Sequence, residues 1–278
     1  MFSAALDVAP GFGRPTAVAL HTFFDRLFPQ WEANMAMQDE SRRKAGFGGL
    51  PGIGDLWGAR DLVVVSALAA LDGPAVTDWS HVVHGAPVLA SEARAVPCAL
   101  DWDAADPTPI VLLSFSTVTE QRSVDKLQTA LDALAHLPVH VVATTGGIVD
   151  PDELAAPGNA RVLDFADHDA LLARASLAVG HGGHGTTMRC LSMGVPVVVI
   201  PAKALDQAPI AALVEAWGAG VALPGDADAR LIGSAVDRVL ADPSFASAAR
   251  ELSGLFVGPD GAVPGADALE RLAGGSRT

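Results

Sequence analysis

Short apolar runs of strand length alternate with helix-length segments along most of the chain beyond residue 110. Each run is bounded by turn or charged residues, which is typical of buried strands. Strands that alternate with helices form right-handed βαβ units and give a parallel sheet covered by helices on both faces. The pattern therefore predicts an α/β fold. Its expected strands are Ile110–Phe115, Val139–Thr144, Ala160–Leu163, Leu177–Val179, Val195–Ile200 and Gly220–Leu223.

The part of the chain before these strands shows a less regular pattern. Strands are expected at Thr16–His21 and Asp61–Ser66, with a short extended piece near His81–His84. A helix is expected from Thr22 to about Arg43, because apolar residues recur there at three- and four-residue steps.

The periodicity disappears between Gly85 and Pro109, where four prolines occur. Such a segment is typical of a linker between domains. We therefore expect an N-terminal domain, a linker, a regular α/β domain and a C-terminal tail helix. The expected boundaries are residues 1–84, 85–108, 109–257 and 258–278.

Composition and charge narrow the function classes. The 278 residues are 50% hydrophobic and carry a net charge of −14. A surface this acidic repels a phosphate backbone, which argues against a nucleic-acid partner, although a local nest of N–H groups can still bind one diphosphate. No apolar run is long enough to span a membrane, the N-terminus has no signal pattern, and the two cysteines are isolated. We expect a cytoplasmic protein without a metal site or a cofactor.

The segment after strand Leu177–Val179 carries the strongest functional signal. It reads Gly-His-Gly-Gly-His-Gly-Thr-Thr from Gly180 to Thr187 and leads into a helix. Glycines let the backbone approach a ligand closely, and the free N–H groups and dipole of the helix attract an anion. In an open parallel sheet, ligands bind at the carboxyl ends of the strands, where this loop lies. We expect the loop to bind a diphosphate, the alternative being a turn without a ligand.

A second interpretation uses the same residues. Gly180, Gly182 and Gly185 match the dinucleotide-binding fingerprint, and Asp206 follows about 20 residues later. The fingerprint normally belongs to the first strand of its domain, whereas three βα units precede it here. Asp206 also lies beyond the next strand rather than at its end. An NAD-type dinucleotide-binding protein is therefore kept as an alternative.

The order of the motifs resembles a known family. After the loop, the chain carries Gly-Val-Pro at 194–196, Asp-Gln at 206–207 and Gly-Ala-Gly at 218–220. This set resembles the donor-binding half of the glycosyltransferases that modify macrolide, polyketide and glycopeptide antibiotics, which are relatives of the UDP-glycosyltransferases. The resemblance implies a GT-B fold, with a complete C-terminal Rossmann-like donor domain and a partial N-terminal acceptor domain.

The resemblance also implies a reaction. Such an enzyme transfers a sugar from a UDP- or TDP-sugar to a small apolar acceptor such as a polyketide, with inversion. Its general-base histidine ends a strand that precedes the matching part of this chain. His21 is a less favoured candidate base, because the local sequence supplies no orienting acid, and His81 and His84 lie near the linker.

The missing strand changes what we expect of this chain. An incomplete sheet exposes an unpaired edge, so we expect self-association, protease sensitivity before about Gly85 and inefficient sugar transfer. The alternative to a glycosyltransferase with a shortened chain is a donor-domain remnant that binds a nucleotide or a partner chain without catalysis.

The resemblance assigns donor-binding roles position by position. His181 would hydrogen-bond the diphosphate, and its protonated form would be favoured beside the phosphate charges. Asp206 would bind sugar hydroxyls with its neighbour, unless it serves only as a helix N-cap. Phe165 would stack on the nucleobase, unless it is a core residue. The full expected set is Ser114, Thr117, Phe165, Ala166, His181, Gly183, Gly185, Thr186, Thr187, Asp206 and Gln207.

Two positions depart from the UDP-glucose-type relatives. Arg189 stands where those relatives have a Glu that holds the ribose hydroxyls. Ile210 stands where some of them have a polar residue. Both differences point toward a TDP-deoxysugar as the donor.

Overall fold

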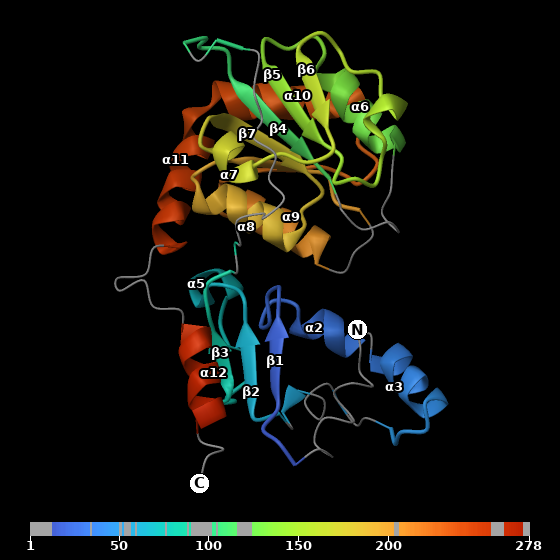
Figure 1. Ribbon diagram of the computed structural model, residues 1–278, viewed down its shortest axis with the longest axis vertical. Coiled ribbons are helices and arrows are strands. Elements are labelled where there is room, and N and C mark those ends of the chain that lie inside the picture. The colour runs from blue at the N-terminus through green and yellow to red at the C-terminus, as the bar shows by residue number, and fades with distance from the viewer. Residues whose placement is uncertain are drawn as a thin grey trace. The chain divides into compact units, whose positions relative to one another are not determined.

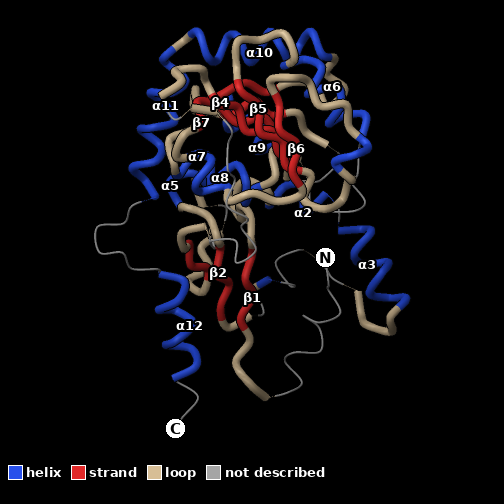
Figure 2. Tube along the Cα trace, turned by 45° about the horizontal axis from the view of Figure 1, so that its top comes forward, coloured by secondary structure: helices blue, strands red, loops and turns tan. Residues whose placement is uncertain are grey.

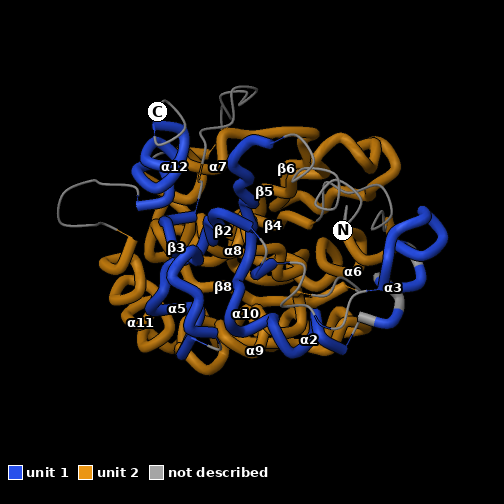
Figure 3. Tube along the Cα trace, turned by 90° about the horizontal axis from the view of Figure 1, so that it is seen from below, with its two compact units in different colours: residues 1–88, 257–278 blue, residues 89–256 orange. Residues whose placement is uncertain are grey.

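The chain divides into two compact units, each built around its own parallel sheet (Figure 3). Unit 1 contains residues 1–88 and 257–278, and unit 2 contains residues 89–256. No helix among the described residues is long and apolar enough to cross a membrane. The computed structural model describes residues 13–33, 35–49, 52, 57–58, 60–75, 77–87, 89, 102–103, 105–115, 124–202, 206–256 and 264–274.

The described residues of unit 2 form six parallel strands, which confirms the predicted α/β fold. They are β4 (Ile110–Ser114), β5 (His140–Thr144), β6 (Ala160–Leu163), β7 (Ala175–Gly180), β8 (Val197–Val199) and β9 (Gly220–Ala222). Their order across the sheet is β6-β5-β4-β7-β8-β9. Since β4 and β7 are the central pair, the loops that follow them lie together at the middle of the carboxyl edge.

Helices cover both faces of this sheet (Figures 1 and 2). They are α6 (Val124–Leu134), η3 (Pro151–Glu153), α7 (His168–Leu172), α8 (His184–Ser192), α9 (Gln207–Ala216), α10 (Ala229–Ala241), α11 (Pro243–Ser253) and η4 (Gly254–Phe256). Helices α6 and α10 contact each other and share one face. Leu112 of β4 points to the opposite face, where it lies beside Cys190 of α8.

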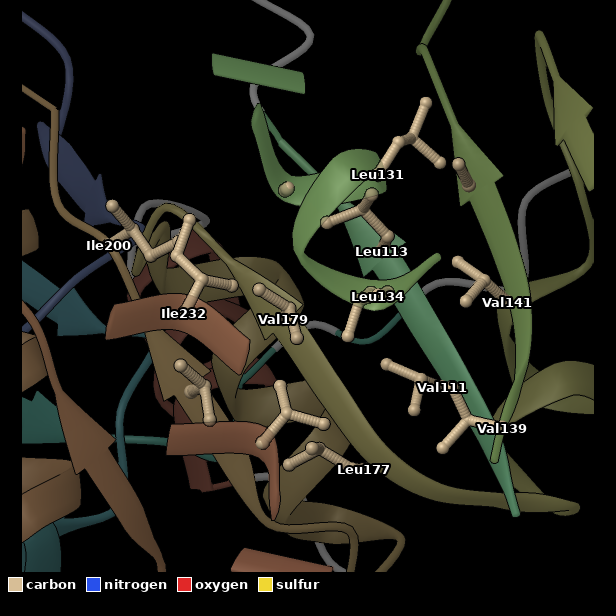
Figure 4. Packing of buried hydrophobic residues seen from close by; sticks show 14 of the residues in the cluster. Val111, Leu113, Leu131, Leu134, Val139, Val141, Leu177, Val179, Ile200 and Ile232 are labelled. Carbon is tan, nitrogen blue, oxygen red and sulfur yellow. The ribbon is translucent and has the colours of Figure 1, made fainter. Parts of the chain in front are cut away.

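The main core of unit 2 lies between the sheet and the α6–α10 layer (Figure 4). Leu131 and Leu134 of α6 point at Val111 and Leu113 of β4, and all four side chains are fully buried. Ile232 of α10 extends the same cluster. Truncating one of these leucines to Ala would cost about 2–5 kcal/mol. This packing fixes the sheet whose carboxyl edge carries the glycine-rich loop from Gly180 to Thr187.

Unit 1 contains a smaller sheet of three parallel strands. The strands are β1 (Ala17–Leu20), β2 (Leu62–Val65) and β3 (Val82–His84), in the order β1-β2-β3. The helices are α2 (Phe28–Ala33), α3 (Met35–Lys44), α5 (Ala69–Asp72) and α12 (Pro264–Gly274). The tail helix α12 packs its Ala268 and Leu272 against Leu62, Val64 and Val83 of the sheet. The C-terminal segment is therefore part of the unit 1 core.

The helix expected from Thr22 to about Arg43 is wrong in its first turns. The segment before Phe28 forms turns, and the helical part is divided between α2 and α3. The cause is a carboxylate that is distant in sequence: Asp72 accepts the backbone N–H of Phe24 at 2.8 Å and of Arg26 at 3.1 Å. These hydrogen bonds to Asp72 take the place of the backbone hydrogen bonds that a helix would form in this segment.

Asp72 is also the centre of a buried charged cluster in unit 1. His84 Nε2 lies 2.7 Å from Asp72 Oδ2 and 3.5 Å from Asp25 Oδ2. The Asp72 side chain is fully buried, and burial raises its pKa. The hydrogen bonds from His84 and from the backbone N–H groups of residues 24–26 outweigh the burial, so the pKa is lowered overall. The ends of α5 and β3 are thus joined to the turn after β1.

We expect Asp72→Asn to destabilise unit 1 by about 3–5 kcal/mol, the range for breaking a buried charged pair. Because the pKa of Asp72 is lowered in the folded state, its contribution is present above the unfolded value of 3.8 and is lost as the pH falls below it. Urea unfolding with hydrogen exchange resolved by segment measures the loss.

Glu40→Gln is the matched control, because Glu40 forms an exposed pair with Lys44 on α3. Exposed pairs contribute only about 0–1 kcal/mol. Equal protection of the unit 1 amides in Asp72→Asn and in Glu40→Gln would show that the cluster does not hold the unit together.

Candidate functional site

The loop between β7 and α8 lies at the carboxyl edge of the unit 2 sheet. It leaves the sheet at Gly180, and α8 begins at His184. Gly182 has a φ of +81°, and a Cβ on it would lie 2.7 Å from Val199 Cγ1 and 3.1 Å from the Gln207 carbonyl oxygen. Only glycine fits there. The first half of the loop is therefore packed against β8 and the start of α9.

The first turn of α8 is more open. Gly185 is exposed, and a Cβ on it would meet no atom within 4 Å. Thr187 donates its N–H to the Gly183 carbonyl at 3.0 Å, so the N–H groups of Gly185 and Thr186 precede the first bond of this helix. Such N–H groups bind anions. The Thr187 side chain is only 2% exposed, which leaves Gly185 and the half-buried Thr186 as the accessible residues.

His181 is buried at the base of this loop. His181 is 9% exposed, and its Nδ1 has no hydrogen-bond partner among the described residues. The pKa of His181 is lowered to about 4, first by burial and second by the nearby Lys126 ammonium, while the Ser114 carbonyl acts in the opposite direction. At neutral pH the imidazole is therefore uncharged in the chain without a ligand.

A hydrogen-bonded chain connects the ends of three successive βα units. Thr144 Oγ1 donates to Ser114 Oγ at 3.0 Å, and His168 Nε2 lies 3.1 Å from the same Thr144 oxygen. Because the Thr144 hydroxyl has one hydrogen, His168 is the donor to it, and the Ser114 hydroxyl keeps its own hydrogen for another acceptor. Ser114 was expected from the sequence, whereas Thr144 and His168 were not. The sequence feature that could have pointed to them is a polar residue at the end of a strand, as for Thr144, or at the start of a helix, as for His168.

Phe165 and Ala166 follow β6 at the same edge of the sheet. Phe165 is 39% exposed and lies over Gly147 in the turn after β5, whereas Ala166 is buried. Phe165 is thus an exposed aromatic ring rather than a core residue. An exposed ring on a rigid strand end can stack on a planar ligand.

Asp206 and Gln207 begin α9 after β8. Asp206 occupies the N-cap position, but its side chain makes no capping hydrogen bond, so the simple capping role is not observed. Gln207 is 2% exposed, and its Oε1 accepts the Ala202 N–H at 2.7 Å. The carboxylate remains half-exposed, while the amide shapes the loop after β8.

Three further positions were singled out in the sequence, namely Arg189, Ile210 and Thr117. Arg189 is buried in α8 and forms an ion pair with Asp169 of α7 at 3.2 Å. Ile210 is fully buried. Thr117 lies outside the described residues.

The histidines of unit 1 occupy different environments. His21 follows β1 and is exposed, and no carboxylate pairs with it in the described part of the chain. His81 stacks on Trp79, with ring centroids 5.6 Å apart. Among the residues of unit 1 that the structure describes, His84 is the one histidine held by carboxylates, through the cluster centred on Asp72. No orienting acid for His21 was found in the sequence, and none is described in the structure.

Solved structures of other proteins show which fold this chain has. The calicheamicin glycosyltransferase CalG4 matches with a TM-score of 0.72 at 23% identity, over 99% of this chain and 70% of CalG4. The spinosyn forosaminyltransferase SpnP matches with a TM-score of 0.74 at 18% identity, over 99% of this chain and 74% of SpnP. The chain has the GT-B fold of these enzymes, as predicted.

The sequence of unit 2 is also similar to a known family of domains. Residues 128–256 match the model of the erythromycin biosynthesis protein CIII-like, C-terminal domain. The matched residues include the loop, Phe165 and Asp206, so this part of the chain is similar to that domain. The resemblance to antibiotic glycosyltransferases is therefore confirmed.

Curated relatives match part of the chain in sequence. The PGL/p-HBAD biosynthesis rhamnosyltransferase of Mycobacterium bovis BCG is 37% identical over 173 residues, which are 61% of this chain and 36% of the relative. The 4'-demethylrebeccamycin synthase of Lentzea aerocolonigenes is 36% identical over 165 residues, 59% of this chain and 38% of the relative. The matched region thus spans little more than a third of these relatives.

These comparisons and the sheet order weigh against the NAD-type alternative. The loop follows β7, which is the fourth strand of unit 2 along the chain and not the first. Asp206 lies past the end of β8, next to the start of α9. Both features differ from the dinucleotide fingerprint, in which the acid ends the adjacent strand.

We expect His181 to titrate with a pKa of about 4 in the ligand-free chain. Between that value and the ordinary 6.5 the unfolded state binds more protons, so the free energy of unfolding falls as the pH falls through this window. Histidine NMR, assigned with His181→Gln, measures the pKa. An ordinary pKa near 6.5 would contradict the burial of the ring.

Proposed function

We propose that the protein is a glycosyltransferase that transfers a sugar from a nucleoside-diphosphate sugar to a small apolar acceptor. The observation that carries the proposal is the open first turn of α8, at the carboxyl end of a central strand of a domain of the antibiotic glycosyltransferase type. The turn presents N–H groups to an anion, and Gly185 leaves the space beside them empty. A diphosphate fits such a site.

The donor-binding residues follow the carboxyl edge of the sheet. Phe165 beyond β6 stacks on the nucleobase, with Ala166 beside it. The diphosphate lies between the loop and the end of β4, and Asp206 beyond β8 binds sugar hydroxyls. In this arrangement Gln207 positions the loop after β8 through Ala202. The residues that contact the diphosphate are His181, Gly183, Gly185, Thr186, Ser114 and Thr117, with Thr187 supporting the turn.

A thymidine diphosphate sugar is the donor that we favour. Arg189 is held by Asp169, so this position does not offer the carboxylate that holds the ribose in UDP-glucose-type relatives. The spinosyn rhamnosyltransferase SpnG has been solved with thymidine diphosphate; it matches with a TM-score of 0.69 at 23% identity, over 93% of this chain and 67% of SpnG. The acceptor hydroxyl attacks the anomeric carbon with inversion, and a general base removes its proton.

The first experiment is calorimetry with TDP, UDP, NAD and the corresponding nucleosides. We expect both diphosphates to bind, and His181→Ala to weaken their binding by about 1.5–3 kcal/mol, as for a hydrogen bond to a charged group. Nucleoside affinity should hardly change. Tight NAD binding with no response to either diphosphate would overturn the proposed function.

A second variant tests the nucleobase subsite. Phe165→Ala should weaken diphosphate and nucleoside binding equally, by about 1–3 kcal/mol, because it removes a stacking partner. Leu255→Ala is the matched control, since Leu255 is also a large exposed apolar residue of unit 2, at 45% exposure against 39% for Phe165. If both variants bind as the wild type does, the nucleobase does not stack on Phe165.

A further inference from the structure

Lys126 occupies an unusual place in unit 2. It lies in the first turn of α6, where the helix dipole and the free N–H groups disfavour a cation. Its side chain is half-buried, and its Nζ donates to the Pro201 carbonyl at 3.4 Å. A cation is disfavoured in the first turn of a helix, and residues that are disfavoured by their local structure are expected at functional sites.

The strand order locates the ammonium group. Helix α6 follows β4, and Pro201 follows β8, while β7 lies between these two strands. A side chain that reaches from the start of α6 to Pro201 therefore spans the carboxyl end of β7. That is the point at which Gly180 and His181 leave the sheet. Lys126 thus lies beside the base of the diphosphate loop, although it is 54 residues away from Gly180 in the sequence.

The turn after β9 completes this environment. Gly225 packs against Pro201: a Cβ on Gly225 would lie 2.5 Å from the Pro201 carbonyl oxygen. The next residue, Asp226, is close enough to raise the pKa of Lys126. The loops after β8 and β9 thereby hold the carbonyl and the carboxylate that face the ammonium group.

Without an anion, the positive charge of Lys126 is disfavoured by its surroundings. Burial lowers the pKa of Lys126 more than Asp226 raises it. The Lys126 charge in turn disfavours the protonated form of His181. Two helix N-termini, of α6 and α8, add their positive ends to the same edge of the sheet. A ligand with two or more negative charges would relieve each of these effects.

We propose that Lys126 is a diphosphate-binding residue, whose ammonium group neutralises the nucleoside diphosphate held by the Gly180–Thr187 loop. The inference rests on the proposed function and adds a cation that the sequence analysis did not select. Because a free diphosphate carries one more negative charge than the diphosphate of a nucleotide sugar, Lys126 favours the free nucleoside diphosphate over the sugar donor.

Calorimetry on the full chain tests this role with Lys126→Met, which keeps the length of the stem and removes the charge. We expect TDP and UDP to bind about 10- to 100-fold more weakly, as for the loss of a charged hydrogen bond, with nucleoside affinity unchanged. Affinity for the nucleotide sugar should fall less than affinity for the free diphosphate. Lys126→Arg should restore most of the diphosphate affinity.

Arg174→Met is the matched control, because Arg174 is an exposed cation at the opposite, amino-terminal end of β7. It should bind both diphosphates as the wild type does. In Lys126→Met without a ligand, the pKa of His181 measured by NMR should rise, which checks that the ammonium group lies beside the base of the loop.

The outcomes separate this inference from the proposed function. If the wild type binds diphosphates and Lys126→Met binds them equally well, Lys126 is not a ligand and the proposed function stands. If Lys126→Met loses nucleoside and diphosphate binding to the same extent, its role is structural and the inference is overturned. If the wild type binds no nucleoside diphosphate, both proposals fail.

Discussion

The pairing of β4 with β7 at the centre of the sheet determines where the site can form. Ser114, the last residue of β4, pairs in register with Gly180, the last residue of β7. This register places a hydroxyl and the start of the glycine-rich loop side by side. β4 is buried along its whole length, so the helices on both faces fix the pairing. A slip of one residue would turn Ser114 to the other face and break the chain through Thr144 and His168.

An anion at this edge of the sheet can be attracted by hydrogen-bond donors and helix dipoles or by a full positive charge, and burial decides which residues supply which. His181 is too buried to be charged at neutral pH, so it contributes a hydrogen-bonding ring and little charge. The N–H groups at the start of α8 contribute oriented dipoles that need no reorganisation when a ligand arrives. In the proposed complex the full positive charge comes from Lys126, on a different helix. Approach of the diphosphate also raises the pKa of His181, because it opposes the Lys126 charge.

Features that depend on local periodicity could be predicted from the sequence. The six strands of unit 2 and the Gly180–Thr187 loop each follow from a contiguous pattern of residues, and so does the tail helix. Features that depend on a polar side chain reaching a distant backbone could not. Asp72 keeps the segment around Phe24 out of the expected helix from 48 positions away, and Gln207 turns inward to hold Ala202. The position of Lys126 likewise required the strand order, which no local motif specifies.

The charge of the whole chain and the charge of the site act over different distances. A net charge of −14 repels a diphosphate at long range, but salt at physiological strength screens exposed charges beyond about 8 Å. Within the site the distances are shorter and the groups are partly buried, so screening is weak there and local dipoles and Lys126 decide the sign of the potential. The same acidic surface disfavours long polyanions, because a nucleic acid would extend beyond the small positive region. In the proposed complex, an acidic protein with the half-buried Lys126 at a helix-lined edge therefore favours a small diphosphate over anions in general.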